Sequence, residues 1–190
     1  MLSSLVLSFS SHFPSILSNY PWLTFMLVLG LAMAVFGWVW MAIIVHRQRR
    51  RRAELRESAY KEEFIPSAQF ERDWIVGGSR GRSAFTGYKY EDGPGCYIIL
   101  IFDSPVEDGD YSGYENVYIG QSVNVCQRVH NHFNGKGNGD VYADVRNGKS
   151  VYVQFKRCDK ADMNRIEKEL IDAFDATSSY NNTRGGGVKR

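Results

Sequence analysis

The stretch ENVYIGQSVNVCQRVHNHF (Glu115–Phe133) predicts a β-strand that passes directly into a helix. Its first part, NVYIG (116–120), is rich in β-branched and aromatic residues, which is typical of a strand. A helix is predicted over residues 123–133, because apolar residues recur there at helical spacing: Val125, Val129 and Phe133. Three polar side chains of this helix are not explained by packing: Arg128, His130 and His132.

Two further strands are predicted around this stretch. CYIILIF (96–102) is a continuous apolar run, which indicates a buried strand, and an acidic, glycine-containing loop (103–115) joins it to residues 116–120 as an antiparallel hairpin. SVYVQFKRC (150–158) alternates in polarity as a third strand. Two further helical segments are expected, residues 142–146 and 160–174. We therefore predict an α+β fold in residues 95–184, with a small three-stranded antiparallel sheet flanked by helices.

The segment before this domain predicts a membrane anchor. Residues 21–45 contain no charged residue, and as a helix they would span about 37 Å, more than the ~30 Å of a bilayer core. Tryptophans lie near both ends of the run, as in interfacial aromatic belts. A cleaved signal peptide is the alternative, but the run is long for one and lacks a basic leading region. We therefore predict a single transmembrane helix that contacts the lipid bilayer.

The charges after this helix predict its orientation. HRQRRRR (46–52) follows the apolar run directly, so the positive-inside rule predicts a cytoplasmic domain and an outer amino-terminal segment, residues 1–20. The expected location is thus the inner (cytoplasmic) membrane. Residues 46–94 are interpreted as a basic juxtamembrane segment and linker, and residues 185–190 as a basic tail.

The charge balance limits how this protein binds anions. The net charge is +2, but six of the 23 basic residues fall in residues 47–57, which leaves 17 basic and 19 acidic residues from Ser58 onward. A nucleic acid would therefore have to meet a local basic cluster. Cysteines in a cytoplasmic domain are expected to be reduced thiols.

Glu167 is the most informative anomaly of the last predicted helix. It lies within the apolar stripe of that helix, whose other members are Met163, Leu170, Ile171 and Phe174. A carboxylate that faces a core is unfavourable by several kcal/mol unless it is paired or binds a cation. A buried salt bridge to an arginine and a metal ligand are both open interpretations from this helix alone.

The earlier helix and the strands offer further polar groups. Arg128 and His132 are four residues apart and project from one side of their helix, which on its own is typical of a solvated edge. Tyr118 emerges from the strand that precedes the helix, and Tyr97 could lie across the hairpin from it. We expect these four side chains and Glu167 to converge on one concave surface, with His130 outside it and exposed.

These residues together resemble the GIY-YIG nuclease domain. GCY (95–97) stands where GIY is usual, and YIG (118–120) follows after a loop. The resemblance continues through Arg128, His132 as in some restriction enzymes of the family, a helical Glu167 and a late asparagine, Asn181 or Asn182. Two positions depart from the pattern: Cys96 replaces isoleucine, and Gln121 stands where lysine is frequent.

The resemblance implies a divalent metal site and a set of catalytic roles. Glu167 would hold one ion, Mg²⁺ or Mn²⁺, and Arg128 would contact a phosphate whose negative charge is growing. Tyr97 would be the general base or would orient the attacking water, and Tyr118 would position the phosphate or the water. His132 would hydrogen-bond Tyr97 or shuttle its proton, and Asn181 would brace the site.

Together with the predicted membrane anchor, the resemblance implies a membrane-anchored, metal-dependent endonuclease that hydrolyses phosphodiester bonds of nucleic acid, with DNA as the expected substrate. A bacterial or phage origin fits such an enzyme. Residues expected to contact the backbone of the substrate are Lys136, Lys149, Lys156, Arg157 and Arg184. The alternative is a non-catalytic, membrane-tethered nucleic-acid-binding or scaffold protein with this fold.

Overall fold

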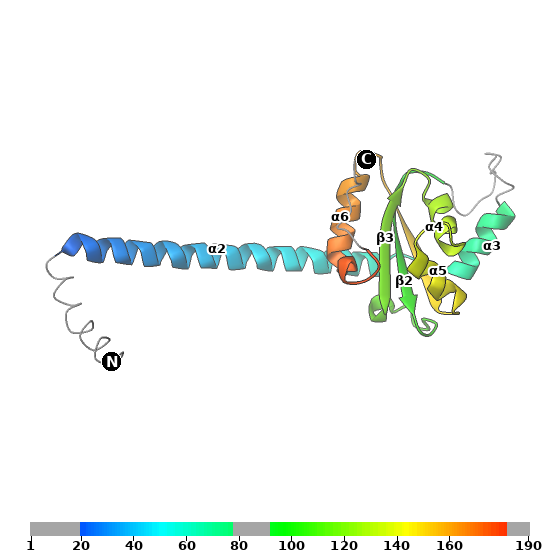
Figure 1. Cartoon of the computed structure of the whole chain (residues 1–190), viewed down its shortest axis with the longest axis horizontal. Helices are drawn as coiled ribbons and strands as arrows, with labels where there is room; N and C mark the ends of the chain where they lie inside the picture. Colours follow the sequence, from blue (N-terminus) through cyan, green and yellow to red (C-terminus); the bar gives the residue numbers. More distant parts are fainter. Residues whose placement is uncertain (1–19, 78–91, 182–190) are drawn as a thin grey trace, which may run out of the picture. The chain divides into compact units, whose positions relative to one another are not determined.

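The computed structural model describes residues 20–77 and 92–181. The helices are α2 (Pro21–Tyr60), α3 (Ser67–Gly77), α4 (Val125–Phe133), α5 (Gly139–Arg146) and α6 (Met163–Phe174), with 3-10 turns η1 (Tyr111–Gly113) and η2 (Ala176–Ser178). The strands are β1 (Ile65–Pro66), β2 (Gly95–Phe102), β3 (Asn116–Ser122) and β4 (Ser150–Arg157). The chain divides into two compact units, one that ends at Arg49 and one that begins at Arg50. The second unit is α+β, as predicted (Figure 1).

The first unit contains the apolar part of α2. In the part of the chain that the structure describes, this is the one helix long and apolar enough to cross a membrane. Its large apolar side chains are exposed, from Trp22 through Val45. An exposed surface of this kind is unfavourable in water and favourable in lipid, so the helix has the properties of a membrane span.

The sheet has four antiparallel strands rather than the three predicted from the sequence. Their order is β1-β4-β2-β3, with β2 in the centre between β3 and β4. The additional strand, β1, pairs Ile65 with Val153 and Pro66 with Tyr152. It has only two residues, and Pro66 can occupy it because an edge position needs no backbone N–H on its outer side.

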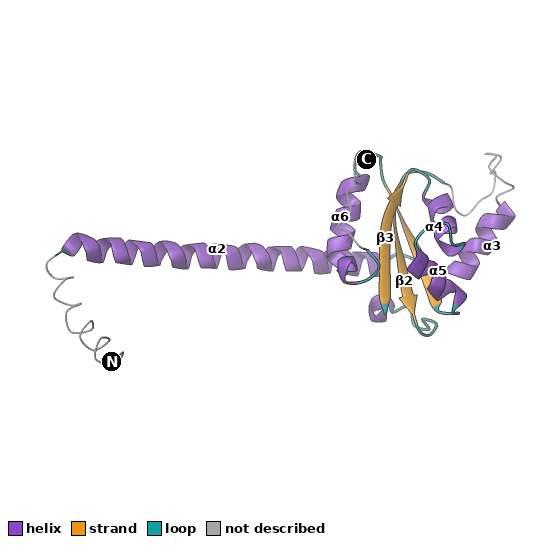
Figure 2. Cartoon of the chain, in the orientation of Figure 1, coloured by secondary structure: helices purple, strands orange, loops and turns teal. Residues whose placement is uncertain are grey.

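Each face of the sheet carries its own apolar cluster. Cys96, Ile98 and Leu100 of β2 pack with α6 on one face, whereas Tyr97, Ile99 and Ile101 pack with α4 and its neighbours on the other. Figure 2 shows α6 on one side of the strands and α3, α4 and α5 on the opposite side. Successive residues of a strand point to opposite faces, so an uninterrupted apolar run such as β2 is buried on both.

The segment before β2 is part of the core. Phe64 is 2% exposed and Phe70 is fully buried, and each packs in one of the two clusters. The side-chain amide of Gln154, on β4, donates a 2.8 Å hydrogen bond to the carbonyl of Ala59 at the end of α2. The range interpreted as a linker thus contains β1 and α3 and contributes side chains to both faces of the sheet.

The helix boundaries differ by a few residues from those predicted. Helix α4 begins at Val125, and the Asp92 carboxylate accepts the N–H of Cys126 at its first turn, at 2.9 Å. Helix α5 begins at Gly139, because the side chain of Asn138 caps it. Helix α6 begins at Met163. Side-chain caps satisfy N–H groups that the first helical turn leaves unpaired.

The outer edge of β3 is closed by the segment that follows α6. Val117 donates its N–H to the hydroxyl of Ser179 and accepts the N–H of Tyr180. The side chain of Asn181 accepts the N–H of Ile119 at 2.8 Å and donates to the carbonyl of Ile119 at 2.7 Å. These contacts replace a fifth strand, so the edge presents fewer unpaired groups.

Candidate functional site

Tyr97 lies at the centre of the candidate site. It is 1% exposed, on the α4 face of β2, and it pairs in register with Gly120 of β3. A Cβ atom at position 120 would collide with the Tyr97 hydroxyl, so only glycine lets the phenol lie across the neighbouring strand. The glycine of the YIG tripeptide therefore has a steric reason in this fold.

His132 contacts the Tyr97 hydroxyl. Its Nε2 lies 2.8 Å from the phenolic oxygen, and its Nδ1 accepts the backbone N–H of Asn138 at 2.6 Å. The imidazole is fully buried. Burial, and secondarily the charge of Arg128, lowers the pKa of His132 to about 4, so the ring is neutral near pH 7.

These contacts determine which nitrogen of His132 carries the hydrogen. A neutral imidazole has one N–H, and Nδ1 must be the acceptor because it faces a backbone donor. The hydrogen is therefore on Nε2, and His132 donates to the oxygen of Tyr97. The glycine-rich turn after α4 sets this arrangement, since a Cβ atom at Gly137 would collide with the ring.

Tyr118 and Arg128 complete this group. The Tyr118 ring lies 4.9 Å from the His132 ring and 6.2 Å from the Tyr97 ring, measured between centroids. Burial, followed by the contact with Tyr118, raises the pKa of Tyr97 well above its usual value, and the charge and hydrogen bonding of Arg128 oppose that rise. Tyr97 is therefore a protonated phenol near neutral pH.

Glu167 lies in the buried stripe of α6, as predicted, and is 8% exposed. Its Oε2 accepts a 2.9 Å hydrogen bond from the side-chain amide of Gln121 on β3. A carboxylate is a hard oxygen donor, and Mg²⁺ is commonly held by one or two carboxylates with water and phosphate supplying the other ligands. In the ranges 20–77 and 92–181 no group of three or more His, Cys, Asp or Glu side chains could hold a metal ion.

The site residues form two groups on opposite faces of β3. Tyr97, Tyr118 and His132 belong to the α4 face, whereas Gln121 and Glu167 meet on the α6 face. Gly120 and Gln121 are adjacent in β3, so the two groups adjoin at this edge strand, which lies between α6 and α4 in Figure 1. The residues thus border the end of an edge strand rather than line one face of the sheet.

Asn181 acts on the backbone of the same strand. It is 8% exposed, and both polar groups of its side chain are bonded to Ile119, which stands between Tyr118 and Gly120. This arrangement fits a bracing role. The alternative residue, Asn182, lies outside the described residues.

The residues predicted to contact the nucleic-acid backbone differ in their exposure and in their partners. Lys136 is exposed in the turn after α4. Lys149 is surrounded by three carboxylates, those of Asp103, Glu115 and Asp144, and Lys156 pairs with Glu62 at 3.1 Å. Arg157 donates to the carbonyl of Gly93. Arg184 and the predicted basic tail lie outside the described residues. Residues 1–19 of the predicted outer segment also lie outside them.

His130 is not the exposed residue that the sequence suggested. Its side chain is 26% exposed, and its Nδ1 lies 2.9 Å from the carboxylate of Glu71 on α3. Asn134 donates to the same carboxylate at 3.1 Å. His130 therefore joins α3 to the helix that carries Arg128 and His132.

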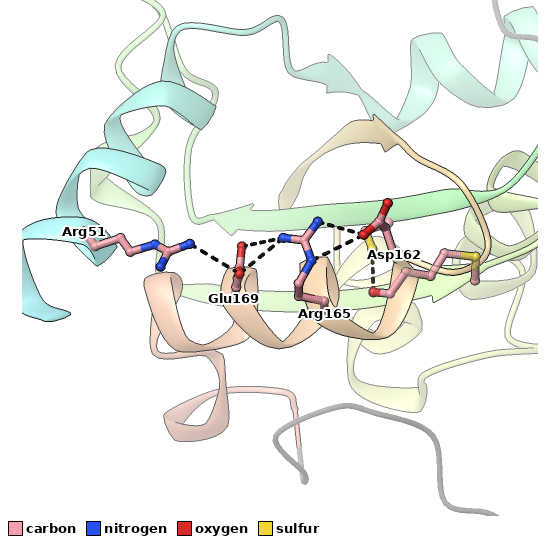
Figure 3. Close-up of polar contacts among 6 residues, drawn as sticks. Arg51, Asp162, Arg165 and Glu169 are labelled. Atoms are coloured by element: carbon pink, nitrogen blue, oxygen red, sulfur yellow. Dashed lines mark hydrogen bonds and ion pairs between the residues drawn. The ribbon is translucent and has the colours of Figure 1, made fainter.

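The outer face of α6 carries a line of ion pairs (Figure 3). Arg165 contacts Asp162 at 2.9 Å and Glu169 at 3.3 Å, and Arg51 of α2 contacts Glu169 at 3.6 Å. Arg52 contacts Asp172 at 3.6 Å in the same way. Exposed pairs of this kind contribute about 0–1 kcal/mol each. Two arginines of the juxtamembrane run thus lie against the helix whose inner face carries Glu167.

Sequence reasoning missed the supporting contacts of the site. The sequence predicts no contact between Gln121 and Glu167, and it does not indicate that the backbone N–H of Asn138 is the partner of His132. The position of Gln121 directly after YIG, at the end of a strand, was the available signal. No family model, no curated protein and no solved structure matches this chain.

Proposed function

We propose that this protein is a membrane-anchored, divalent-metal-dependent endonuclease of the GIY-YIG type that hydrolyses phosphodiester bonds of nucleic acid. The observation that carries the proposal is the buried group around Tyr97. Its hydroxyl accepts a hydrogen bond from His132, and its neighbours are a second phenol and a guanidinium. A structural core would be expected to hold apolar side chains at these positions.

Each residue of this group has a proposed role. Arg128 donates to the scissile phosphate, because a guanidinium offers planar paired donors to phosphate oxygens. Tyr97 orients the attacking water, because its raised pKa leaves the phenol protonated near neutral pH. His132 holds the Tyr97 oxygen in place; a proton shuttle through Nε2 is disfavoured, because that nitrogen already carries a hydrogen.

Glu167 is the proposed metal ligand, and its buried carboxylate fits a hard divalent cation. When bound, Mg²⁺ or Mn²⁺ supplies positive charge that stabilises the phosphate and the leaving oxygen. Tyr118 lies beside Tyr97 and His132 and positions the phosphate or the water. Asn181 keeps Ile119, and with it the YIG strand, in register.

The proposed location is the inner membrane, with the amino terminus outside and the nuclease domain in the cytoplasm. The arginines at 47–52 support this orientation, because basic residues remain on the cytoplasmic side of a span. DNA is the proposed substrate, and an anchored nuclease would meet DNA that crosses the membrane. Of the expected contacts to the nucleic-acid backbone that the structure describes, Lys136 is the best placed, because its side chain is exposed beside the turn that holds His132.

The test is cleavage by the full-length chain in detergent, with defined single- and double-stranded DNA and RNA. Cleavage is expected with Mg²⁺ or Mn²⁺ and none with chelator. Glu167→Gln and Arg128→Ala should each reduce the rate at least about a hundredfold. Glu107→Gln, which changes an exposed glutamate of the loop after β2, is the matched control and should retain the rate.

Two results would contradict the proposal. Undiminished cleavage by Glu167→Gln would remove the metal role from this carboxylate. Binding of nucleic acid without cleavage, across several divalent ions and all substrates, would instead support the non-catalytic alternative.

A further inference from the structure

Gln121 joins the last helix to the YIG strand. It follows Gly120 in β3. Its side chain is partly buried and contacts α6. Its Nε2 donates to Oε2 of Glu167 at 2.9 Å and to Oδ1 of Asn164 at 2.6 Å. Both hydrogens of one amide nitrogen are thus directed at two side chains of the same helix, one turn apart.

The chemistry of these partners fixes the orientation of the amide. An ionised carboxylate only accepts hydrogen bonds, so the group of Gln121 that faces Glu167 must be the NH₂ group and not the oxygen. Asn164 then presents its oxygen to the second hydrogen. The three side chains have a consistent set of donors and acceptors in this arrangement alone.

The contact restricts a side chain that is otherwise flexible. The side chain of a glutamate has three rotatable bonds. The first two prefer discrete staggered angles, whereas rotation about the last bond, which turns the carboxylate plane, is only weakly restricted. A hydrogen bond to Oε2 selects one orientation of the carboxylate plane relative to β3. Asn164 is exposed, and its Oδ1 accepts the second hydrogen of the Gln121 amide group.

We propose that Gln121 is a positioning residue, which, with Asn164, orients the Glu167 carboxylate for a divalent cation. This inference rests on the proposed metal role of Glu167. Groups that hydrogen-bond a metal ligand typically change metal affinity by about tenfold to a hundredfold when they are removed. In this role Gln121 would act on the Glu167 carboxylate rather than on the phosphate or the reacting water.

The test is Mn²⁺ binding, followed by electron paramagnetic resonance, on the full-length chain in detergent. Gln121→Met keeps the length of the side chain and removes both donors. We expect its Mn²⁺ dissociation constant to rise about tenfold. Gln127→Met is the matched control, because Gln127 is an exposed glutamine on α4, and it should bind Mn²⁺ like the unmodified chain.

Cleavage provides a second readout. In Gln121→Met the Mg²⁺ concentration for half-maximal cleavage should rise by a similar factor, whereas the rate at saturating Mg²⁺ should stay within about threefold. A lower saturating rate at an unchanged half-maximal Mg²⁺ concentration would overturn the inference, because a general structural defect gives that pattern. So would a Mn²⁺ dissociation constant that changes by less than about threefold.

Asn164→Ala keeps the inference testable if Gln121→Met does not fold. Asn164 is exposed, so its truncation should leave the fold intact, and it frees the Gln121 amide to move away from Glu167. The Mn²⁺ dissociation constant should rise in this variant too, by a smaller factor. Unchanged Mn²⁺ affinity in Asn164→Ala, with Gln121→Met unfolded, would count against the inference.

Glu167→Ala separates the two proposals. If it abolishes Mn²⁺ binding while Gln121→Met binds normally, the metal site stands and the positioning role fails. If Glu167→Ala binds Mn²⁺ like the unmodified chain, the proposed metal role itself fails.

Discussion

The hydroxyl oxygen of Tyr97 lies 2.8 Å from Nε2 of His132, and this hydrogen bond joins the central strand β2 to helix α4. Both side chains are buried, at 1% and 0% exposure. Because Nδ1 of His132 is bonded to Asn138, the hydrogen of this bond belongs to the imidazole. The phenolic oxygen is therefore held as an acceptor at a defined position beside Tyr118.

Removal of the Tyr97 hydroxyl should lower both stability and cleavage. Tyr97→Phe leaves the buried N–H of His132 without its acceptor, which should reduce the free energy of unfolding by about 1–3 kcal/mol. The cleavage rate should fall about a hundredfold or more, because the attacking water loses its proposed orienting group. Thermal unfolding and single-turnover cleavage measure the two effects.

Tyr142→Phe is the control for this variant, because Tyr142 is a partly buried tyrosine of α5 outside the Tyr97 group. It should leave the cleavage rate unchanged. Cleavage by Tyr97→Phe at the rate of the unmodified chain would show that the phenol has no part in the reaction.

A methyl group at position 120 should displace Tyr97. The Cβ atom of Gly120→Ala would collide with the Tyr97 hydroxyl and the adjoining ring atoms, so the ring must move away from His132. Overpacking of this kind typically destabilises a protein by about 1–3 kcal/mol, and the cleavage rate should fall with the displaced hydroxyl. Gly113→Ala is the control, since a Cβ atom there meets nothing within 4 Å. Equal melting temperatures and rates for the two variants would contradict the proposed packing.

The main elements were predictable because their patterns are long. The apolar run of β2, the alternation in β4 and the stripe on α6 each extend over at least eight residues and specify a period. The buried position of Glu167 followed from the same stripe. The short strand β1 has only two residues, one of them proline, and no periodicity can identify it.

The contacts between elements were not predictable, because they depend on side-chain geometry. The sequence placed Tyr97 and His132 near each other but did not reveal that Asn138 fixes the imidazole hydrogen. Nor did it show that Glu167 and Tyr97 lie on opposite faces of the sheet, since this depends on which face of β2 packs against α6. The burial of Phe70 in the core was not predictable, because the sequence around it has an irregular composition without a clear period.

The buried neutral state of His132 should make stability depend on pH. Its pKa in the folded protein is about 4, below the usual value of 6.5, so the unfolded chain binds more protons between these values. The contribution is complete above pH 6.5 and is lost as the pH falls toward 4, at up to about 1.4 kcal/mol per pH unit. The melting temperature of the unmodified chain should therefore fall more steeply over this range than that of His132→Gln, which cannot titrate there. Parallel curves for the two proteins would show that folding does not lower the pKa of His132.

The boundary of the folded domain can be tested by truncation. A fragment that begins at Gly95, where the sequence placed the start of the nuclease domain, lacks two aromatic side chains of the core, Phe64 and Phe70. Burial of each contributes about 1.5–3 kcal/mol, so the two together contribute about 3–6 kcal/mol, a large share of the roughly 5–15 kcal/mol that stabilises a typical domain. The fragment should therefore lack a cooperative thermal transition.

A fragment that begins at Arg50 retains β1, α3 and the end of α2, and it should unfold cooperatively and remain soluble without detergent. Cooperative unfolding of the shorter fragment, followed by near-ultraviolet circular dichroism, would show that the segment before β2 is dispensable for the fold.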